Sequence, residues 1–252
     1  MPNSSDLEGR FAENRLLRTF SDALRARLLA DSELVAMPEG EIVVRTGVNL
    51  LRTYFPLGET TVSLNAEIDG GRSIEVASIG SEGAIGGIVS CGHYPAFARA
   101  EVIVAGPAIV VARDKVEEAK AGSGHLRNIF CRYSDYLLAQ IMQSVGCNSF
   151  HSIEQRAARW LLTAIDRAGP RLQLTQEQLA RLLGVQRTTL NAVVRSLQDD
   201  GAITIRRGSI ELRDRAQLLR RSCYCYEAVE RHFGDVIGEG GLGAHPSESC
   251  GD

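Results

Sequence analysis

The spacing of apolar positions changes twice along the chain. Residues 11–29 carry leucine and phenylalanine at helical intervals, which predicts one or two helices after a disordered start at 1–10. From residue 32 to 111 the pattern changes to short β-type runs, separated by glycine or proline. The runs cover residues 41–45, 52–55, 60–65, 73–79, 97–104 and 108–112. Many short strands at this spacing predict a small barrel or roll, and helical spacing returns at residue 114.

Residues 175–197 predict two short amphipathic helices joined by a tight turn at Gly184. Thr175 and Gln178 match a capping box, which marks the start of the first helix. Each helix has one apolar face, and the second helix carries arginine, threonine and asparagine on the other. Such side chains can hydrogen-bond base edges or phosphates. This pattern is typical of a helix-turn-helix, whose second helix enters the DNA major groove.

A β-hairpin is predicted directly after the helix pair. Residues 202–205 and 209–212 are apolar strands, and Arg206-Arg207-Gly208 forms a basic turn suited to a phosphate contact. The helix pair alone fits an ordinary helical hairpin with solvated arginines, but the hairpin makes a winged helix and favours DNA binding. The recognition helix is expected over about 186–198. The candidate DNA contacts are Thr175, Gln186, Arg187, Thr188, Thr189, Asn191, Arg195, Arg206 and Arg207.

A long apolar stripe runs between these two halves. A helix from about residue 124 to 147 would be about 36 Å long, too long for one small roll to cover. The stripe fits a core helix of one subunit or a seam between two subunits. We expect the seam, because a two-fold dimer reads palindromic DNA. The expected seam residues are Leu126, Phe130, Tyr133, Leu137 and Ile141.

The charge of the chain is divided unevenly. The formal net charge is −3, yet residues 150–222 contain 13 arginines against 7 acidic residues. An acidic front and a basic back fit a sensor attached to a DNA-binding domain. No apolar run approaches the roughly 20 residues of a membrane span, and the first residues lack signal-peptide features. We therefore expect a cytoplasmic protein without a membrane partner.

The six cysteines form no C-x-x-C pair. Cys223 and Cys225 are two residues apart, and on a helix such a pair does not share a face. Buried or incidental thiols are the favoured interpretation, with a metal or redox site as the minor alternative. An iron–sulfur cluster usually needs four cysteines, and the first 90 residues contain none. We therefore predict no metal and no cofactor.

Taken together, these features resemble those of the Crp/Fnr transcription regulators, relatives of the cyclic-AMP receptor protein and the fumarate–nitrate regulator. The resemblance runs from about residue 16 to 233. It rests on residues 54–56 with 62–64, 69–76, 79–86, 156–162 and 174–212, and Ser222-Cys-Tyr-Cys-Tyr226 looks like the C-terminal signature of one bacterial branch. It implies an α+β fold: a cupin-like β-roll of the cyclic-nucleotide-binding type, a long dimerisation helix and a C-terminal winged helix-turn-helix. The expected divisions are 11–123, 124–148 and 150–233, with a disordered tail at 234–252.

The sequence departs from the family pattern at the effector site and in the recognition helix. Gly87 and Tyr94 stand where the family's phosphate-binding Glu and Arg are expected, so cyclic AMP should bind weakly or not at all. Backbone amides could still cradle an anion. The candidate effector pocket is Gly80, Glu82, Gly83, Gly86, Gly87, Tyr94 and Arg99. In the recognition helix Arg187 matches the family's first arginine, while Thr188 and Ala192 replace a glutamate and a second arginine.

The sequence thus predicts a homodimeric transcription regulator that binds a palindromic DNA operator. The resemblance adds RNA polymerase and an unidentified small-molecule effector as candidate partners. The rival is an effector-binding or protein-interaction module that has lost tight DNA binding. An enzyme is third, because the chain has no G-x-S-x-G, Walker A or H-E-x-x-H motif and its histidines are scattered.

Overall fold

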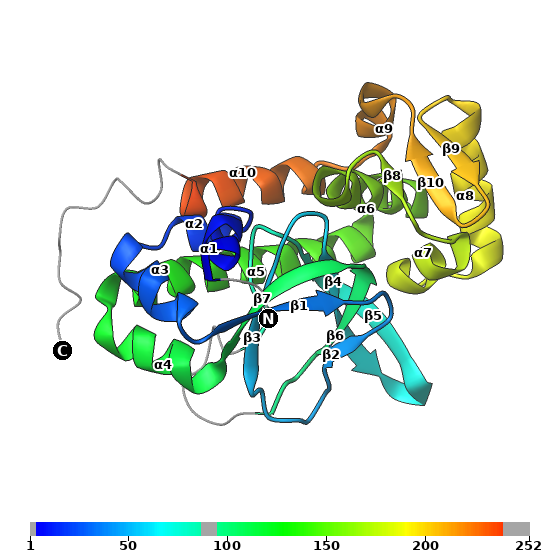
Figure 1. Cartoon of the computed structure of the whole chain (residues 1–252). Coiled ribbons are helices and arrows are strands. Elements are labelled where there is room, and N and C mark those ends of the chain that lie inside the picture. Colours follow the sequence, from blue (N-terminus) through cyan, green and yellow to red (C-terminus); the bar gives the residue numbers. More distant parts are fainter. Residues whose placement is uncertain (1–3, 87–94, 239–252) are drawn as a thin grey trace.

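The computed structural model describes residues 4–86 and 95–238. Figure 1 shows two halves, a β-roll with helices and a smaller helical domain with a hairpin, joined by one long helix. This is the α+β architecture expected from the sequence, with antiparallel sheets first and a helix-turn-helix last. Gly87, Tyr94 and most of the predicted tail lie outside the described residues.

The roll consists of two antiparallel sheets. One has the strand order β1–β7–β3, from Ser32–Met37, Gly106–Ala112 and Arg52–Pro56. The other has the order β2–β6–β4–β5, from Ile42–Val44, Arg99–Val104, Thr61–Ile68 and Arg72–Ile79. Alternate residues such as Val62, Ile79 and Val102 face inward and form an apolar core. The sequence pattern found every one of these strands except β1.

Short helices cover one end of the roll. They are α1 (Ser4–Phe11), α2 (Arg15–Arg18), α3 (Asp22–Leu29) and, after the last strand, α4 (Arg113–Gly122). Phe20 makes edge contacts with Phe55 of β3 and with Phe130. These contacts hold the short helices to the sheet. Residues 1–10 were expected to be disordered, but α1 is helical. The reason is that Leu7 and Phe11, one helical turn apart, are both buried in this core.

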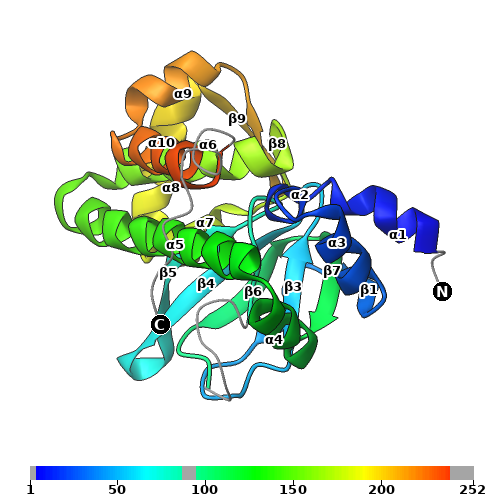
Figure 2. The same ribbon diagram turned by 90° about the vertical axis from the view of Figure 1, so that its left-hand side faces the viewer.

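The long helix α5 (Gly124–Phe150) runs across the roll (Figure 2). The face that was expected to meet a second subunit packs against the core of this chain instead. Leu126, Phe130 and Tyr133 are fully buried in the core of this single chain, so they are not available as a seam between subunits. Burial raises the pKa of Tyr133 well above its usual value, and its neutral hydroxyl exchanges hydrogen bonds with the backbone of Ala84. Leu137 and Ile141 are half-buried, Leu137 against the same core.

The C-terminal domain packs around a second core. It contains α6 (Ile153–Ala168), α7 (Gln176–Leu183), α8 (Arg187–Asp199) and α9 (Arg215–Arg221). A small sheet completes it, in the order β8–β10–β9, from Arg171–Leu172, Ser209–Leu212 and Ile203–Arg206. The capping box predicted at the start of α7 is confirmed, and a second one begins α6.

The last helix leaves this domain and returns to the first half. Helix α10 (Cys225–Ile237) runs beside α5, and its Phe233 packs edge-on against Tyr136 (Figure 1). Phe233 and Ile237 are buried in the core of the first half. The helix continues past residue 233, where we placed the start of a disordered tail, because Ile237 still has an apolar surface to cover.

Candidate nucleic-acid interface

The turn between α7 and α8 sets the angle of the recognition helix. Gly184 adopts the left-handed conformation, with φ 66°, and its N–H caps the end of α7. Glycine tolerates this conformation at no steric cost. On α8, Leu190, Val194 and Leu197 are fully buried against the domain core. The remaining face of α8 therefore points outward.

That outward face carries most of the residues predicted to contact DNA. Five of them are exposed: Gln186, Arg187, Thr188, Thr189 and Arg195. Asn191 is half-buried, and its Oδ1 atom has no hydrogen-bond partner in the described part of the chain. Arg187 Nη1 lies 3.7 Å from the Glu177 carboxylate, and both side chains are exposed. An exposed pair of this kind contributes about 0–1 kcal/mol, so the Arg187 guanidinium can exchange it for another acceptor.

A groove lies between the β9–β10 hairpin and the starts of α7 and α8. Arg206 and Arg207 stand exposed at the hairpin tip, next to the positive-φ Gly208. Thr175, Arg187 and Arg206 line the groove between the start of α7, the start of α8 and the hairpin. The Thr175 hydroxyl is held by the capping box with Gln178. The structure thus brings residues from three separate elements to one basic surface.

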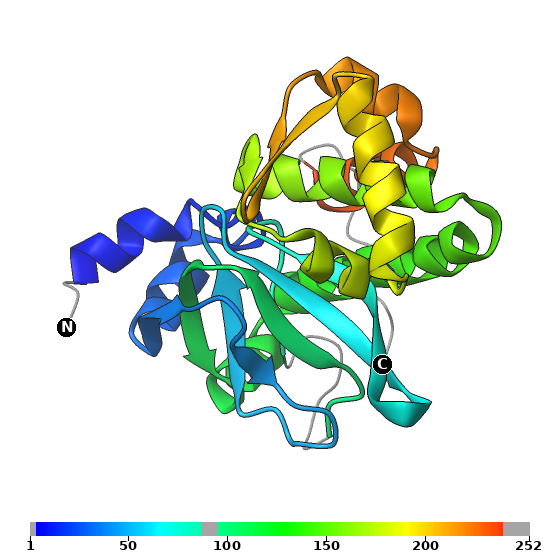
Figure 3. The same cartoon turned by 90° about the vertical axis from the view of Figure 1, so that its right-hand side faces the viewer.

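The helix-turn-helix also touches the roll, through polar contacts that are partly exposed. Figure 3 shows α7 lying beside β5. Arg181 of α7 pairs with Glu101 of β6 at 3.0 Å, and the Gln178 amide donates to Glu39 at 2.7 Å. Gly184 faces Ile74 of β5 closely enough that an added Cβ would lie 3.4 Å from it.

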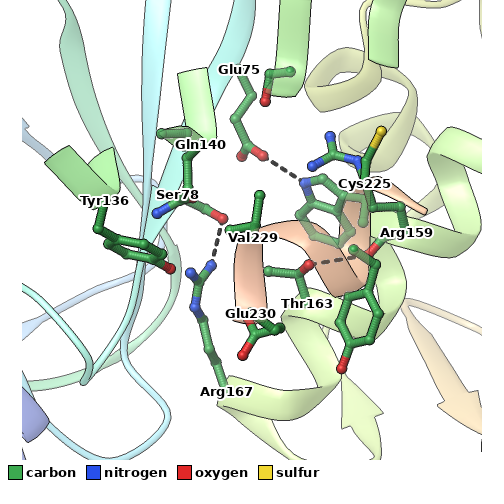
Figure 4. A pocket seen from close by; sticks show the side chains of 14 residues that line it. Glu75, Ser78, Tyr136, Gln140, Arg159, Thr163, Arg167, Cys225, Val229 and Glu230 are labelled. Atoms are coloured by element: carbon green, nitrogen blue, oxygen red, sulfur yellow. Dashed lines mark hydrogen bonds between the residues drawn. The ribbon is translucent and has the colours of Figure 1, made fainter. Parts of the chain in front are cut away.

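A second contact between the two halves is buried. Arg167 of α6 donates two hydrogen bonds to the Glu82 carboxylate, at 2.7 and 3.2 Å, and a third to the Ser78 hydroxyl (Figure 4 shows the bond to Ser78). The Arg167 and Glu82 side chains are only 9% and 8% exposed. Sequence reasoning missed Arg167, because its partner lies 85 positions away.

A tryptophan adds to the same buried contact. Trp160 of α6 donates its ring N–H to Glu75 of β5 at 2.7 Å (Figure 4). Burial raises the pKa of the Glu75 carboxyl, and the hydrogen bond from Trp160 opposes that rise. We call the Arg167–Glu82 and Trp160–Glu75 contacts the buried clamp.

Of the described candidate effector residues, Glu82 belongs to this clamp and Gly80 contacts it, while the others lie elsewhere on the roll. The Gly80 N–H donates to Glu82 at 3.0 Å, and the Gly83 N–H donates to the Gly80 carbonyl. Tyr133 fills the space beside Gly83. Gly86 has φ 88° and faces the Arg52 carbonyl, while Arg99 pairs with Glu101 on β6. Among the described residues, the arginine and the glycine amides are therefore not gathered around one cavity.

Three cysteines and a histidine meet where α5 gives way to α6. Cys147 lies near the end of α5, His151 caps that helix, and Cys223 and Cys225 lie at the junction of α9 and α10. Their ligand atoms all lie within 4.8 Å of one another. On one helix Cys223 and Cys225 would not share a face, as expected from the sequence. Cys223 lies before α10 begins, however, so the two thiols can meet.

Comparison with known proteins identifies the domain that carries the interface. Residues 155–221 match the Crp-like helix-turn-helix domain family. About three quarters of the chain resembles solved regulators in fold. FixK2 from Bradyrhizobium japonicum is 16% identical, with a TM-score of 0.66, over 76% of this chain and 98% of that one. A CRP-family transcriptional regulator from Thermus thermophilus is 20% identical, with a TM-score of 0.61, over 75% and 96%.

A third similar structure is the c-di-GMP-responsive global regulator CLP of Xanthomonas campestris, with 19% identity and a TM-score of 0.61 over 77% of this chain and 100% of that one. No curated protein matches the chain in sequence. No helix in the described part of the chain is both long and apolar enough to cross a membrane. The chain therefore has the Crp/Fnr fold with a Crp-like helix-turn-helix domain, which supports a DNA-binding transcription regulator.

Proposed function

We propose that the chain is a homodimeric, sequence-specific regulator in which α8 reads bases in the major groove of a palindromic operator. The observation that carries this is the exposed polar face of α8, beside a basic hairpin, inside a Crp-like domain. Arg187 at the start of α8 has the fork geometry that pairs with guanine O6 and N7. Arg206 and Arg207 at the hairpin tip suit phosphate contacts. In this proposal the chain acts by binding DNA in the cytoplasm, and it does not catalyse a reaction.

The dimer is proposed through the exposed face of α5. Leu138, Met142 and Val145 are 51%, 59% and 64% exposed and follow one another at intervals of four and three residues. This is the spacing of a coiled-coil seam, in which each helix covers the apolar stripe of the other. These residues replace the buried Leu126, Phe130 and Tyr133 of the original expectation.

Charged substitutions on this face test the dimer. Leu138→Glu with Met142→Glu would place like charges in the seam, so the variant should sediment as a monomer while keeping its far-ultraviolet circular dichroism spectrum. The matched control is Val48→Glu with Leu51→Glu. These two residues are also exposed and apolar, at 52% and 71%, but they lie between β2 and β3 and not on α5. The control should remain dimeric, and a folded α5 double variant that also remains dimeric would contradict the seam.

The DNA function is tested by selecting bound sequences from random duplex DNA with the purified chain. A regulator of this kind should enrich a site with two inverted half-sites about one helical turn apart, which is about 34–36 Å. Failure to enrich any sequence would favour the rival, a module that no longer binds DNA tightly. A small-molecule effector and RNA polymerase stay predictions of the family resemblance.

A further inference from the structure

The cluster at the α5–α6 break has the chemistry of a metal site. Cys147, Cys223 and Cys225 are buried and form a small group of their own, apart from the apolar cores. With His151 they offer three sulfur atoms and one imidazole nitrogen. Thiolate and imidazole are the ligands that soft or borderline ions such as Zn²⁺ prefer, and three cysteines with one histidine is a common structural zinc set.

The distances fit one shared ion. The Sγ atoms of Cys147 and Cys223 are 3.6 Å apart, and Cys225 Sγ lies 3.3 Å from His151 Nδ1. Tetrahedral zinc, with bonds of about 2.3 Å to sulfur and about 2.0 Å to nitrogen, sets ligand atoms roughly 3.5–3.8 Å apart. A disulfide needs sulfur atoms about 2.05 Å apart. An iron–sulfur cluster distributes its ligands over several irons, whereas these four ligand atoms all lie within 4.8 Å of one another, close enough to surround one ion.

We propose that Cys147, His151, Cys223 and Cys225 bind a single tetrahedral Zn²⁺-type ion. Cys147 and His151 are four residues apart, so they share one face at the end of α5. Cys223 and Cys225 come from a separate segment, across the break between α9 and α10. The proposal stands apart from the proposed function, since it rests only on these four ligand positions.

The surroundings complete the site. The Gln143 side-chain amide, one turn before Cys147, donates to Cys225 Sγ at 3.0 Å, as the outer hydrogen bonds of metal thiolates do. Arg159 of α6 and Cys225 border the same small cavity (Figure 4), which places a cation near a centre that would carry net negative charge. Only His151 and Ser152 separate α5 from α6. The ion would therefore fasten the α9–α10 junction to the point where the DNA-binding domain leaves α5.

Metal content of the tag-free, full-length chain tests the site. The chain is purified under reducing conditions from cells supplied with zinc, and metals are measured by mass spectrometry. We expect about one zinc per chain for the wild type, and a loss of most of it in Cys223→Ser and in Cys147→Ser. Cys131→Ser is the matched control, because Cys131 is an exposed thiol on α5 outside the cluster, and it should keep the zinc.

Cobalt substitution gives a second readout, which reports the ligands themselves. Metal-free wild type titrated with Co²⁺ should develop thiolate-to-cobalt charge-transfer absorption that saturates at one equivalent. Cys225→Ser should lower that intensity by about one third, and His151→Asn should preserve it while shifting the visible bands, because three thiolates remain. Absence of any metal, metal that stays unchanged in the cluster variants, or a Cys147–Cys223 disulfide in the protein as first isolated under reducing conditions would each overturn the proposal.

Discussion

The DNA-binding domain meets the roll at two junctions of opposite character. The buried clamp joins α6 to the roll through Arg167 and Glu82, both less than a tenth exposed. The contact of α7 with the roll uses Arg181, whose side chain is 56% exposed, and Gln178. Their partners are Glu101, which is 12% exposed, and Glu39, which is exposed. Buried charges lose far more when a partner is removed than exposed charges do. The clamp is therefore the junction that fixes the position of the domain, and the α7 contact is one that water can replace.

Breaking the clamp should have the largest effect. Arg167→Met leaves the Glu82 carboxylate buried without its partner and should lower the free energy of unfolding by about 3–5 kcal/mol. Urea denaturation of the full chain measures this. Arg167→Met with Glu82→Gln removes both charges while the glutamine oxygen still accepts from the Gly80 N–H, so most of the stability should return. A double variant as unstable as the single one would contradict the role given to the ion pair.

The exposed junction should respond weakly. Arg181→Ala removes the pair with Glu101, whose partner Arg99 remains on the same carboxylate. The free energy of unfolding should change by about 0–1 kcal/mol, and the change should shrink further in high salt. A loss as large as that of Arg167→Met would show that the two junctions are not different in kind.

Local features were predictable from the sequence and distant pairings were not. The capping boxes, the Gly184 turn and the outward face of α8 depend on residues within one or two turns, so their patterns can be read directly. On α5 both the buried row through Phe130 and the exposed row through Met142 are apolar, and periodicity alone does not distinguish a core from a seam. The two clamp contacts each span 85 positions, and contacts within the cysteine cluster span 74 and 76, so only the fold brings these residues together.

In the proposed function, α8 reads bases while the hairpin holds the phosphate backbone. Arg187→Ala and Arg206→Ala are titrated against the selected operator and its single-base variants at several salt concentrations. Arg187→Ala should cost about 1–3 kcal/mol at the operator and relax the preference at one base pair in each half-site. Arg206→Ala should weaken all sequences about equally and lower the salt-dependence slope by about 1. Uniform weakening by Arg187→Ala together with changed base preference in Arg206→Ala would contradict the assignment.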